Sequence, residues 1–469
     1  MIRLTTKQIQ EKLKFIESYA NASNSANASK LDANANVSSK NIATLHAELN
    51  KDFNVQIKRA KVYEHIQKLF GENIADSYIR QLESHEIYCH DESAAVLPYC
   101  LALSMYPFVS NGLQDFGGES KAPKHLSSYN GGYVNMIFAA SSQVAGAVAS
   151  VEYLLFFDYF ARKDYGENYL IEHEDIIRQE LQQVVYAINQ PASARGYQSV
   201  FLNWSVFDKY YFNGIFEHFA YPDGTKPNYG SISRLQNYFM SWFNKERTKA
   251  LLTFPVVTAA CLHNNTELLD KDFEKMITKE LSEGNAFFIY LSDNVSSLSS
   301  CCRLRNDVSD QLNEFSYSLG AGGVMTGSLN VITLNLNRFI QKTFSKWSKY
   351  TDVDWKEFYV KELEKQIELI HKYQLGFRDM YEEYIKAGLM PLYDANFINI
   401  DKQFLTLGIN GLVESAEYLD YTISNNKPYK DYIQTILSTF TEMNKKAKIK
   451  YGVKFNTEQV PKMSGNKAA

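Results

Sequence analysis

Two adjacent cysteines are the sharpest local feature of this chain. Cys301 and Cys302 lie in the run SSCCRLRND, directly before Arg303. Neighbouring side chains on an extended segment point in opposite directions, so one thiol could face a cavity while the other packs. A disulfide between adjacent cysteines is strained, so a direct bond between them is not expected. The residues alone leave two interpretations open, a pair of small buried hydrophobes or a redox-active thiol pair.

A third cysteine follows a segment that begins like a strand. Cys100 ends the run HDESAAVLPYC and starts an apolar stretch. Alone, such a residue is usually part of the core, but a thiol close to Cys302 could exchange hydrogen or electrons with it. Two weaker signals are the HDE loop at residues 90–92, more typical of a hydrogen-bonded loop than of a metal site, and the glycine-rich residues 320–323, which lack the lysine of a phosphate-binding loop.

The elements that must position these thiols are expected to be alternating helices and short strands. Apolar spacing predicts helices at residues 6–19, 41–49, 57–70, 132–163, 171–189, 355–387 and 444–450, and strands at residues 85–89, 287–291 and 331–336. The most apolar stretch, 138–157, carries Ser, Gln and Glu and is therefore expected to be a buried helix. Residues 21–41 read by composition as a linker, and residues 455–469 as an irregular tail. This alternation favours an α/β architecture.

Composition excludes several classes of protein. The chain has 469 residues, and its 32 Tyr and 29 Phe can fill a large core. A net charge of −4 gives no electrostatic basis for binding nucleic acid. We find no secretory signal and no apolar run of about 18 residues, so we expect a cytoplasmic protein that does not contact a membrane. The five cysteines include no CxxC pair, so neither a disulfide framework nor a four-cysteine zinc site is expected, and no metal site is assigned.

Several segments, in their order along the chain, resemble the large subunit of class III anaerobic ribonucleotide reductases. They are NASNSANASKLDANANVSSKNIATLHAEL, HDESAAVLPYC, GGESKAPKHL, AINQPASARGYQSVFLNWSVFD, LLTFPVVTAA, SSCCRLRND, TGSLNVITLNLNR and FLTLGINGLVESAEYL. The resemblance implies an α/β fold, a ten-stranded barrel of two half-barrels with a central cysteine finger loop. It also implies that residues 21–41 are an ordered entry to the barrel, contrary to their composition.

The resemblance implies roles for five residues. The family's thiyl-radical cysteine directly precedes an arginine, which points to Cys302 as the radical residue and to Arg303 beside the substrate. Cys100 matches the second thiol that faces the substrate. Formate-using members carry Asn at the substrate-facing position of Ser328, so this chain is more similar to the subgroup reduced by a thioredoxin- or glutaredoxin-like protein, with formate left open. Cys301 would then assist the disulfide step.

The implied chemistry is anaerobic reduction of ribonucleoside triphosphates to deoxyribonucleoside triphosphates. A sulfur radical can remove the 3′ hydrogen of ribose because S–H and C–H bonds have comparable strengths. The 2′-hydroxyl then leaves as water, Cys100 supplies hydrogen, and the radical returns to Cys302. Oxidised thiols must be reduced before the next turnover, and a barrel interior keeps solvent away from the intermediate.

Other parts of the family pattern do not match. The Arg-x-x-Gly-Tyr type glycyl-radical motif and the nearby cysteine cluster are not found, since the RGY at residues 195–197 has the wrong spacing. We therefore expect one catalytic barrel domain over residues 1–469, made of an N-terminal helix (1–20), a family-like barrel (21–461) and a divergent tail (462–469). An ATP-cone and a glycyl-radical or zinc domain are not expected.

The partners follow from this organisation. A separate chain would carry the glycyl radical, installed by a radical S-adenosylmethionine activating enzyme, and this chain would bind no cofactor of its own. A deoxynucleotide or ATP effector and a homodimer are expected. Two alternatives stay open, an inactive nucleotide-binding remnant and an acyltransferase related to pyruvate formate-lyase, which also carries adjacent cysteines on a fingertip.

Overall fold

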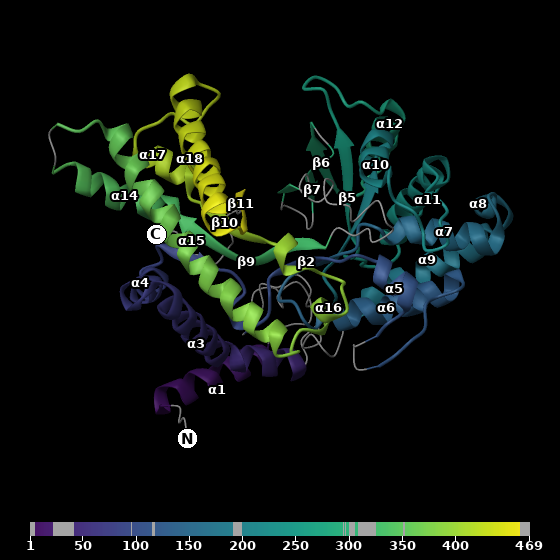
Figure 1. The fold of residues 1–469 in the computed structure, drawn as a ribbon, viewed down its shortest axis with the longest axis horizontal. Coiled ribbons are helices and arrows are strands. Elements are labelled where there is room, and N and C mark those ends of the chain that lie inside the picture. The colour runs from purple at the N-terminus through teal and green to yellow at the C-terminus, as the bar shows by residue number, and fades with distance from the viewer. Residues whose placement is uncertain are drawn as a thin grey trace.

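One curled sheet with helices packed around it forms the centre of the molecule (Figure 1). The computed structural model describes residues 5–21, 42–94, 96–114, 118–190, 199–293, 295, 297–299, 305–307, 325–349 and 352–459. Within these residues nine strands join the sheet in the order β11-β10-β9-β2-β3-β4-β5-β6, and β1 pairs with β9. β6 and β11 form the two edges of this sheet in the described part of the chain.

The first half of the sheet consists of five parallel strands joined by helices. The strands are β2 (Cys100–Ala102), β3 (Val148–Ala149), β4 (Leu202–Phe207), β5 (Val256–Leu262) and β6 (Phe288–Ser292). The helices are α5 (Tyr106–Asn111), α6 (Leu126–Ser141), α7 (Tyr153–Tyr165), α8 (Tyr169–Glu172), α9 (Glu174–Ile188), α10 (Lys209–Phe216), α11 (Tyr229–Arg247) and α12 (Lys271–Ser282). Parallel strands require such crossover connections, and the helices bury the outer face of the strands.

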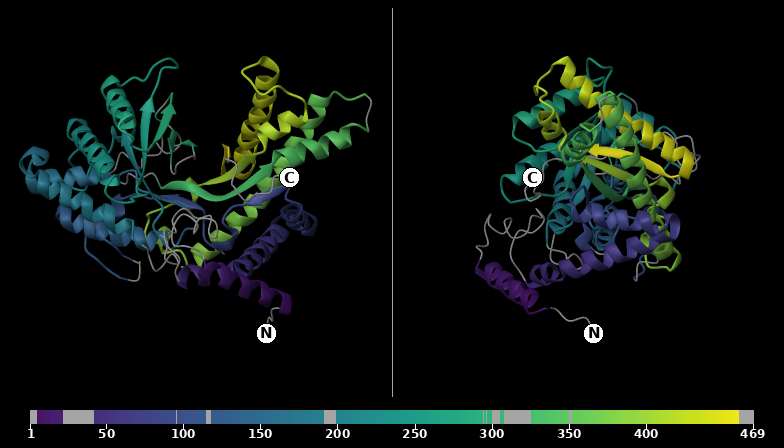
Figure 2. Two further views of the ribbon diagram at one scale, coloured as in Figure 1. Left: turned by 180° about the vertical axis from the view of Figure 1, so that it is seen from behind. Right: turned by 90° about the vertical axis from the view of Figure 1, so that its left-hand side faces the viewer.

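The second half of the sheet is built from the C-terminal third of the chain and one early strand. Its strands are β1 (Ile87–Cys89), β9 (Thr326–Asn335), β10 (Phe404–Asn410) and β11 (Lys454–Gln459), of which β9, β10 and β11 are parallel. Its helices are α14 (Leu336–Trp347), α15 (Trp355–Lys386), α16 (Pro391–Asp394), α17 (Leu412–Tyr418) and α18 (Lys427–Tyr451). The two halves lie at opposite ends of the curled sheet, as the rear view shows (Figure 2).

The halves meet where β2 runs antiparallel to β9. Cys100 lies opposite Ser328, and Leu101 lies opposite Gly327. The α/β half-barrel architecture that we expected is confirmed, but nine strands join the sheet in the described residues in place of the expected ten. The joint brings a residue at position 100 beside one at position 328 because the chain returns to this point after completing the first half.

The longest helix covers the second half of the sheet. The Asp354 side chain accepts a hydrogen bond from Glu357 N and caps the start of α15. α15 then buries a stripe of apolar side chains at helical spacing, among them Leu363, Ile367, Ile370 and Phe377. It packs on β9 and β10 and on α3 (Ile42–Phe70), which is followed by α4 (Glu72–Glu83).

Some expected elements are confirmed and others are wrong. Strands at 85–89 and 287–291 and the helices at 6–19, 171–189 and 355–387 are present. The stretch 138–157 is not one buried helix, because α6 ends at Ser141, β3 follows, and α7 begins at Tyr153. The tail is not irregular throughout, since β11 begins at Lys454. Most of the stretch 21–41 lies outside the described residues, which include only Asn21, the last residue of α1 (Thr6–Asn21).

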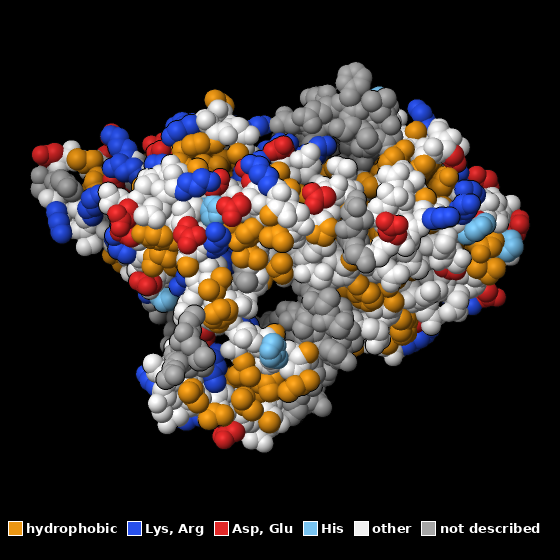
Figure 3. Space-filling model, turned by 60° about the horizontal axis from the view of Figure 1, so that its bottom comes forward, with side chains coloured by type: hydrophobic (Ala, Val, Ile, Leu, Met, Phe, Trp, Pro, Cys, Tyr) orange, Lys and Arg blue, Asp and Glu red, His pale blue; other side chains and the backbone are white. Residues whose placement is uncertain are grey.

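The N-terminal helices α1 and α3 lie at one side of the molecule, where α3 packs against α15. Viewed from below, hydrophobic side chains gather on this side (Figure 3), and Ile9 and Leu13 on α1 and Phe53 and Ile57 on α3 are exposed. Lys12 and Asp52 join the two helices through an ion pair of 2.6 Å. None of the helices in the described ranges is long and apolar enough to span a membrane.

Candidate functional site

Cys100 lies buried at the joint between the two halves of the sheet. Its side chain is 3% exposed, and its Sγ accepts a hydrogen bond of 3.3 Å from the backbone N–H of Ala147, which precedes β3. Gly146 allows this approach, because a Cβ there would lie 2.8 Å from Cys100 Sγ and 2.9 Å from Tyr99 O. The thiol therefore lies close against the backbone of Gly146 and Ala147.

The face of the sheet that carries Cys100 and Ser328, here called the Cys100 face, continues across the first half. Side chains alternate between faces along a strand, so Ala102 shares the face of Cys100. Ala102 is paired with Ala149, and Ala149 with Asn203. Trp204, the next residue, points the other way and donates to Tyr133 OH on α6 at 2.7 Å. The Cys100 face is thus lined by small and polar side chains.

The same face carries a hydrogen-bonded chain on the second half. Ser328 Oγ lies 2.7 Å from Thr406 Oγ1 and 3.1 Å from Asn330 O, and Thr406 Oγ1 donates to Asn456 Oδ1 at 2.7 Å. Ser328, Thr406 and Asn456 come from the three parallel strands β9, β10 and β11. Sequence reasoning found Ser328 but missed Thr406 and Asn456, which lie in family-like segments without any local chemical signal.

The opposite face is packed against α15 and holds a second polar group. Asn330 Nδ2 donates to Gln374 Oε1 at 3.1 Å, and Gln374 Nε2 donates to Thr406 O at 2.7 Å. The Cys89 thiol donates weakly to Asn330 Oδ1 at 3.7 Å, and burial raises the pKa of this thiol far above its ordinary value. These contacts fix the backbone of β9 and β10 behind Ser328 and Thr406.

The HDE loop between β1 and β2 is held by α3. Arg59 makes two hydrogen bonds to the Glu92 carboxylate, of 2.9 and 2.6 Å, and Asn54 Nδ2 donates to Ser93 O. His90 Nε2 lies 2.8 Å from Thr333 Oγ1, and burial lowers the pKa of His90 to about 4. Among the described residues no group of three or more His, Cys, Asp or Glu is placed to hold a metal ion.

A short hairpin stem leads to the adjacent cysteines. β7 (Ser297–Ser299) pairs antiparallel with β8 (Arg305–Asp307), with Ser299 opposite Arg305. β7 lies beside β5 of the first half, and β8 lies beside β11 of the second half. Residues 300–304 connect the two strands. Cys301, Cys302 and Arg303 therefore lie outside the described residues, as does the glycine-rich stretch 320–323, and their predicted roles stay predictions.

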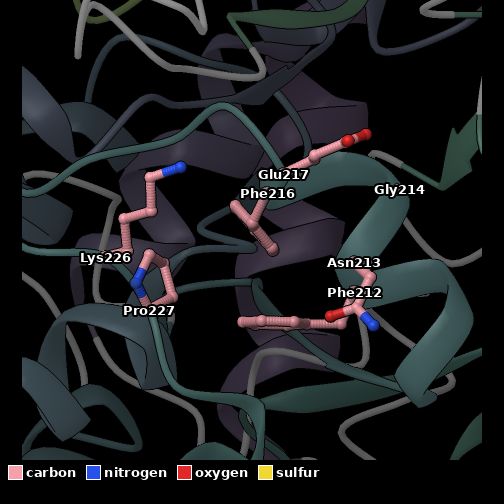
Figure 4. A pocket seen from close by; sticks show the side chains of 7 residues that line it. All are labelled: Phe212, Asn213, Gly214, Phe216, Glu217, Lys226 and Pro227. Atoms are coloured by element: carbon pink, nitrogen blue, oxygen red, sulfur yellow. The ribbon is translucent and has the colours of Figure 1, made fainter.

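Two surface pockets of the described residues lie elsewhere. One, of about 440 Å³, is formed by α10 and the following loop and is lined by Phe212, Asn213, Gly214, Phe216, Glu217, Lys226 and Pro227 (Figure 4). A second, of similar volume, lies between α15 and α18. Neither includes a residue of the Cys100 face. The register of the sheet and the hydrogen bonds of Cys100 and Ser328, both buried, define the candidate site.

Comparisons with known proteins agree with this geometry. The family model for anaerobic ribonucleoside-triphosphate reductase matches residues 47–464. The anaerobic ribonucleotide reductase of Thermotoga maritima with citrate in the active site is 28% identical, with a TM-score of 0.79 over 98% of this chain and 79% of that one. The structure of the Thermotoga enzyme in complex with dATP and CTP is 26% identical, with a TM-score of 0.79 over 100% of this chain and 78% of that one.

A further solved structure, described as an anaerobic ribonucleotide reductase, is 29% identical, with a TM-score of 0.80 over 98% of this chain and 70% of that one. A search of curated proteins gave no match. The family model covers most of the chain, and the sheet with its Cys100–Ser328 joint has the fold of these enzymes. The chain therefore belongs to the anaerobic ribonucleoside-triphosphate reductase family, and its activity is the reduction of nucleotides.

Proposed function

We propose that this chain reduces ribonucleoside triphosphates with Cys302 as the thiyl-radical residue and Cys100 as the second thiol. The observation that carries the proposal is the position of Cys100, fixed on the Cys100 face at the joint of the two half-sheets. The β7–β8 stem, which leads into the segment with Cys302, lies beside strands from both halves. This arrangement supports a fingertip that reaches the same substrate as Cys100.

The proposed reaction consumes two electrons and two protons. The Cys302 radical takes the 3′ hydrogen, the C2′–O bond breaks, and the 2′-hydroxyl leaves as water with an added proton. Cys100 supplies the hydrogen that forms the new C2′–H bond, and the 3′ hydrogen returns from Cys302. The second electron and proton come from Cys301, so that Cys100 and Cys301 end as a disulfide, which a thioredoxin- or glutaredoxin-like protein reduces. Arg303 contacts the substrate beside Cys302.

Ser328 supports a redox protein rather than formate as the reductant. Its hydroxyl is engaged by Thr406 Oγ1 and Asn330 O and lies directly opposite Cys100. The Ser328 hydroxyl is a small polar group next to the thiol. Formate-using relatives carry the amide of an asparagine at this position. Ser328 then contacts the substrate ribose rather than a formate ion.

The radical would come from a glycyl radical on a separate chain, which would supply the unpaired electron to Cys302. A radical S-adenosylmethionine enzyme would activate that chain. Since one Thermotoga structure holds dATP in its specificity site, we propose a deoxynucleotide or ATP effector for this chain, bound in a homodimer. An electron resonance signal from this chain alone after exposure to the activating enzyme would refute the two-chain arrangement.

A disulfide map tests the thiol assignment without the radical chain. Mild anaerobic oxidation with diamide, followed by peptide mass spectrometry, should link Cys100 to Cys301 or Cys302. Cys100→Ser should abolish this product, while Cys261→Ser, at a buried thiol on β5, should leave it unchanged. If Cys100 stays reduced while Cys301 and Cys302 are oxidised, the fingertip does not reach Cys100. A second test addresses the inactive-remnant alternative. If the chain is such a remnant, no deoxynucleotide should form when the activated partner chain and the reductant are added.

A further inference from the structure

One buried side chain on the Cys100 face has a hydrogen-bond acceptor without a partner among the described residues. Asn203, in the middle of the first half-sheet, is 2% exposed. Its Nδ2 donates to Thr258 Oγ1 on the adjacent strand β5 at 3.0 Å. Its Oδ1 is buried, and no donor within the described part of the chain reaches it.

An orphaned buried acceptor needs an explanation. Most buried polar atoms of side chains have a partner, and one left without a partner keeps the full desolvation penalty. Asn130, another buried asparagine, shows the ordinary situation, because its amide donates to Glu180 and accepts from Tyr153 OH. The bond to Thr258 holds the Asn203 carboxamide in place, while its oxygen has no hydrogen-bond partner among the described residues.

The position of Asn203 relates it to the proposed thiol. β3 is the only strand between β2 and β4 in the sheet order of the described residues, so Asn203 lies two strands from Cys100 on the same face. Two strand spacings correspond to about 10 Å, and Asn203 is in register with Ala102, two residues or about 7 Å further along the strands than Cys100. The face between them carries the methyl groups of Ala102, Ala147 and Ala149, and Phe201, two residues before Asn203, packs against Cys100 and Ala147 at one side of it. A ring the size of a pentose can lie over such a floor.

The chemistry of the oxygen limits what it can bind. A carboxamide oxygen accepts hydrogen bonds, so it does not suit a phosphate, whose oxygens are also acceptors. The N–H groups of the nucleobases differ in position from one nucleotide to the next, whereas the ribose hydroxyls are common to all. Because Cys100 is proposed to act at C2′, an acceptor further along the Cys100 face can reach the hydroxyl on C3′, the carbon bonded to C2′.

We propose that Asn203 accepts a hydrogen bond from the 3′-hydroxyl of the bound ribonucleotide, with Thr258 as the positioning residue for its carboxamide. This inference rests on the proposed function, because it requires the ribose to lie over the Cys100 face. Asn203 would orient the ring so that the 3′ hydrogen is presented away from Cys100.

Binding of CTP and of 3′-deoxy-CTP tests the contact without any radical chemistry. Titration calorimetry is run on the full chain with dATP present throughout. The unaltered protein should bind CTP about tenfold more tightly than 3′-deoxy-CTP, the factor expected for one hydrogen bond to a buried group. Asn203→Ala should weaken the binding of CTP about tenfold and change the affinity for 3′-deoxy-CTP by no more than about twofold. The variant should therefore no longer prefer CTP over 3′-deoxy-CTP.

A second variant and a control separate this contact from general damage. Thr258→Val keeps the shape of the side chain but releases the carboxamide, and it should reduce the preference for CTP while Asn203 is still present. Asn130→Ala removes a fully partnered buried asparagine on α6, and it should lower the melting temperature without changing the ratio of the two affinities. Thermal unfolding of each variant shows which of them fold.

Three results would overturn the inference. Equal weakening of both nucleotides by Asn203→Ala would indicate a structural role alone. An unchanged preference in both Asn203→Ala and Thr258→Val would show that the 3′-hydroxyl is bound elsewhere. If the folded, unaltered protein binds no CTP, the proposed function fails and the inference fails with it, and this result is distinct from the other two.

Discussion

At the scale of single residues, Glu152 is a carboxyl group buried in the core of the first half of the molecule. It is fully buried where β3 leads into α7, and its Oε2 accepts a hydrogen bond of 2.7 Å from Met105 N, next to the start of α5. Its Oε1 has no donor among the described residues. Burial raises the pKa of Glu152 from 4.5 to about 7, because the charged form loses its hydration, and the Met105 N–H offsets this only in part.

The contribution of Glu152 to the stability of the protein should therefore fall as the pH rises through this range. The unfolded chain releases the Glu152 proton near pH 4.5, whereas the folded chain keeps it until about pH 7. Between these values the unfolded state is favoured increasingly, by up to on the order of 3 kcal/mol. Glu152→Gln has no such proton, so the difference in free energy of unfolding between variant and parent should grow from pH 4.5 to 7 and then level off. Urea unfolding at several pH values measures this difference. If the free energies of unfolding of variant and parent change with pH in the same way, Glu152 does not have a raised pKa.

Residues of the site differ in how far the sequence could predict them. Cys100 and Ser328 were found through family-like segments, and the structure brings them opposite each other across β2 and β9. Asn203 and Thr258 were not found, because a lone Asn or Thr in an apolar strand is an ordinary residue. Their significance depends on pairing between β4 and β5 and on an unsatisfied oxygen, and neither is visible along the chain.

At the scale of elements, the joint of β2 and β9 depends on one glycine. Gly327 has a φ of +138°, and a Cβ there would lie 2.4 Å from Cys100 O and 3.0 Å from Leu101 Cα. A backbone atom cannot move away as the end of a side chain can. Any larger residue at this position must separate the two strands or displace Cys100.

Gly327→Ala should therefore lower the free energy of unfolding by about 2–4 kcal/mol, from backbone strain and overlap together. Gly388→Ala is the matched control, because Gly388 also has a positive φ, of +69°, but no described atom lies within 4 Å of its Cβ position. It should cost only about 1–2 kcal/mol. Urea unfolding midpoints compare the two variants. Equal losses of stability in both would show that the close contact with Cys100 O adds nothing to the cost of a side chain at position 327.

The elements that sequence periodicity missed have physical causes. β3 is two residues long and lies between two buried apolar helices, so residues 138–157 present one continuous apolar run. β11 was read as an irregular tail because its apolar residues are few, yet all six of its residues pair with β10. In contrast, α15 has a capping Asp354 and a regular apolar stripe, and its range was predicted closely. Local signals suffice for long amphipathic helices, while short strands are defined by their neighbours.

At the scale of the whole molecule, the order of the strands cannot be read from the chain. β9 returns to pair with β2 after more than two hundred intervening residues, and only this return places Ser328 beside Cys100. The family resemblance supplied the two half-barrels but not the order of their strands, and the alternation of helices and strands supplied only the α/β class. A site built from both halves also means that a ligand over the joint should stabilise the folded sheet as a unit.

Nucleotide binding should therefore raise the temperature at which the whole protein unfolds. A ligand that binds only the folded state at a hundred times its Kd stabilises that state by about 2.7 kcal/mol. CTP with dATP should give a clear upward shift in scanning calorimetry, and Cys100→Ala and Cys302→Ala should keep this shift, because thiols that transfer hydrogen contribute little to binding. Pyruvate at the same concentration should have no effect. A shift with pyruvate and none with CTP would favour the acyltransferase alternative and would contradict a ribose site over the joint of β2 and β9.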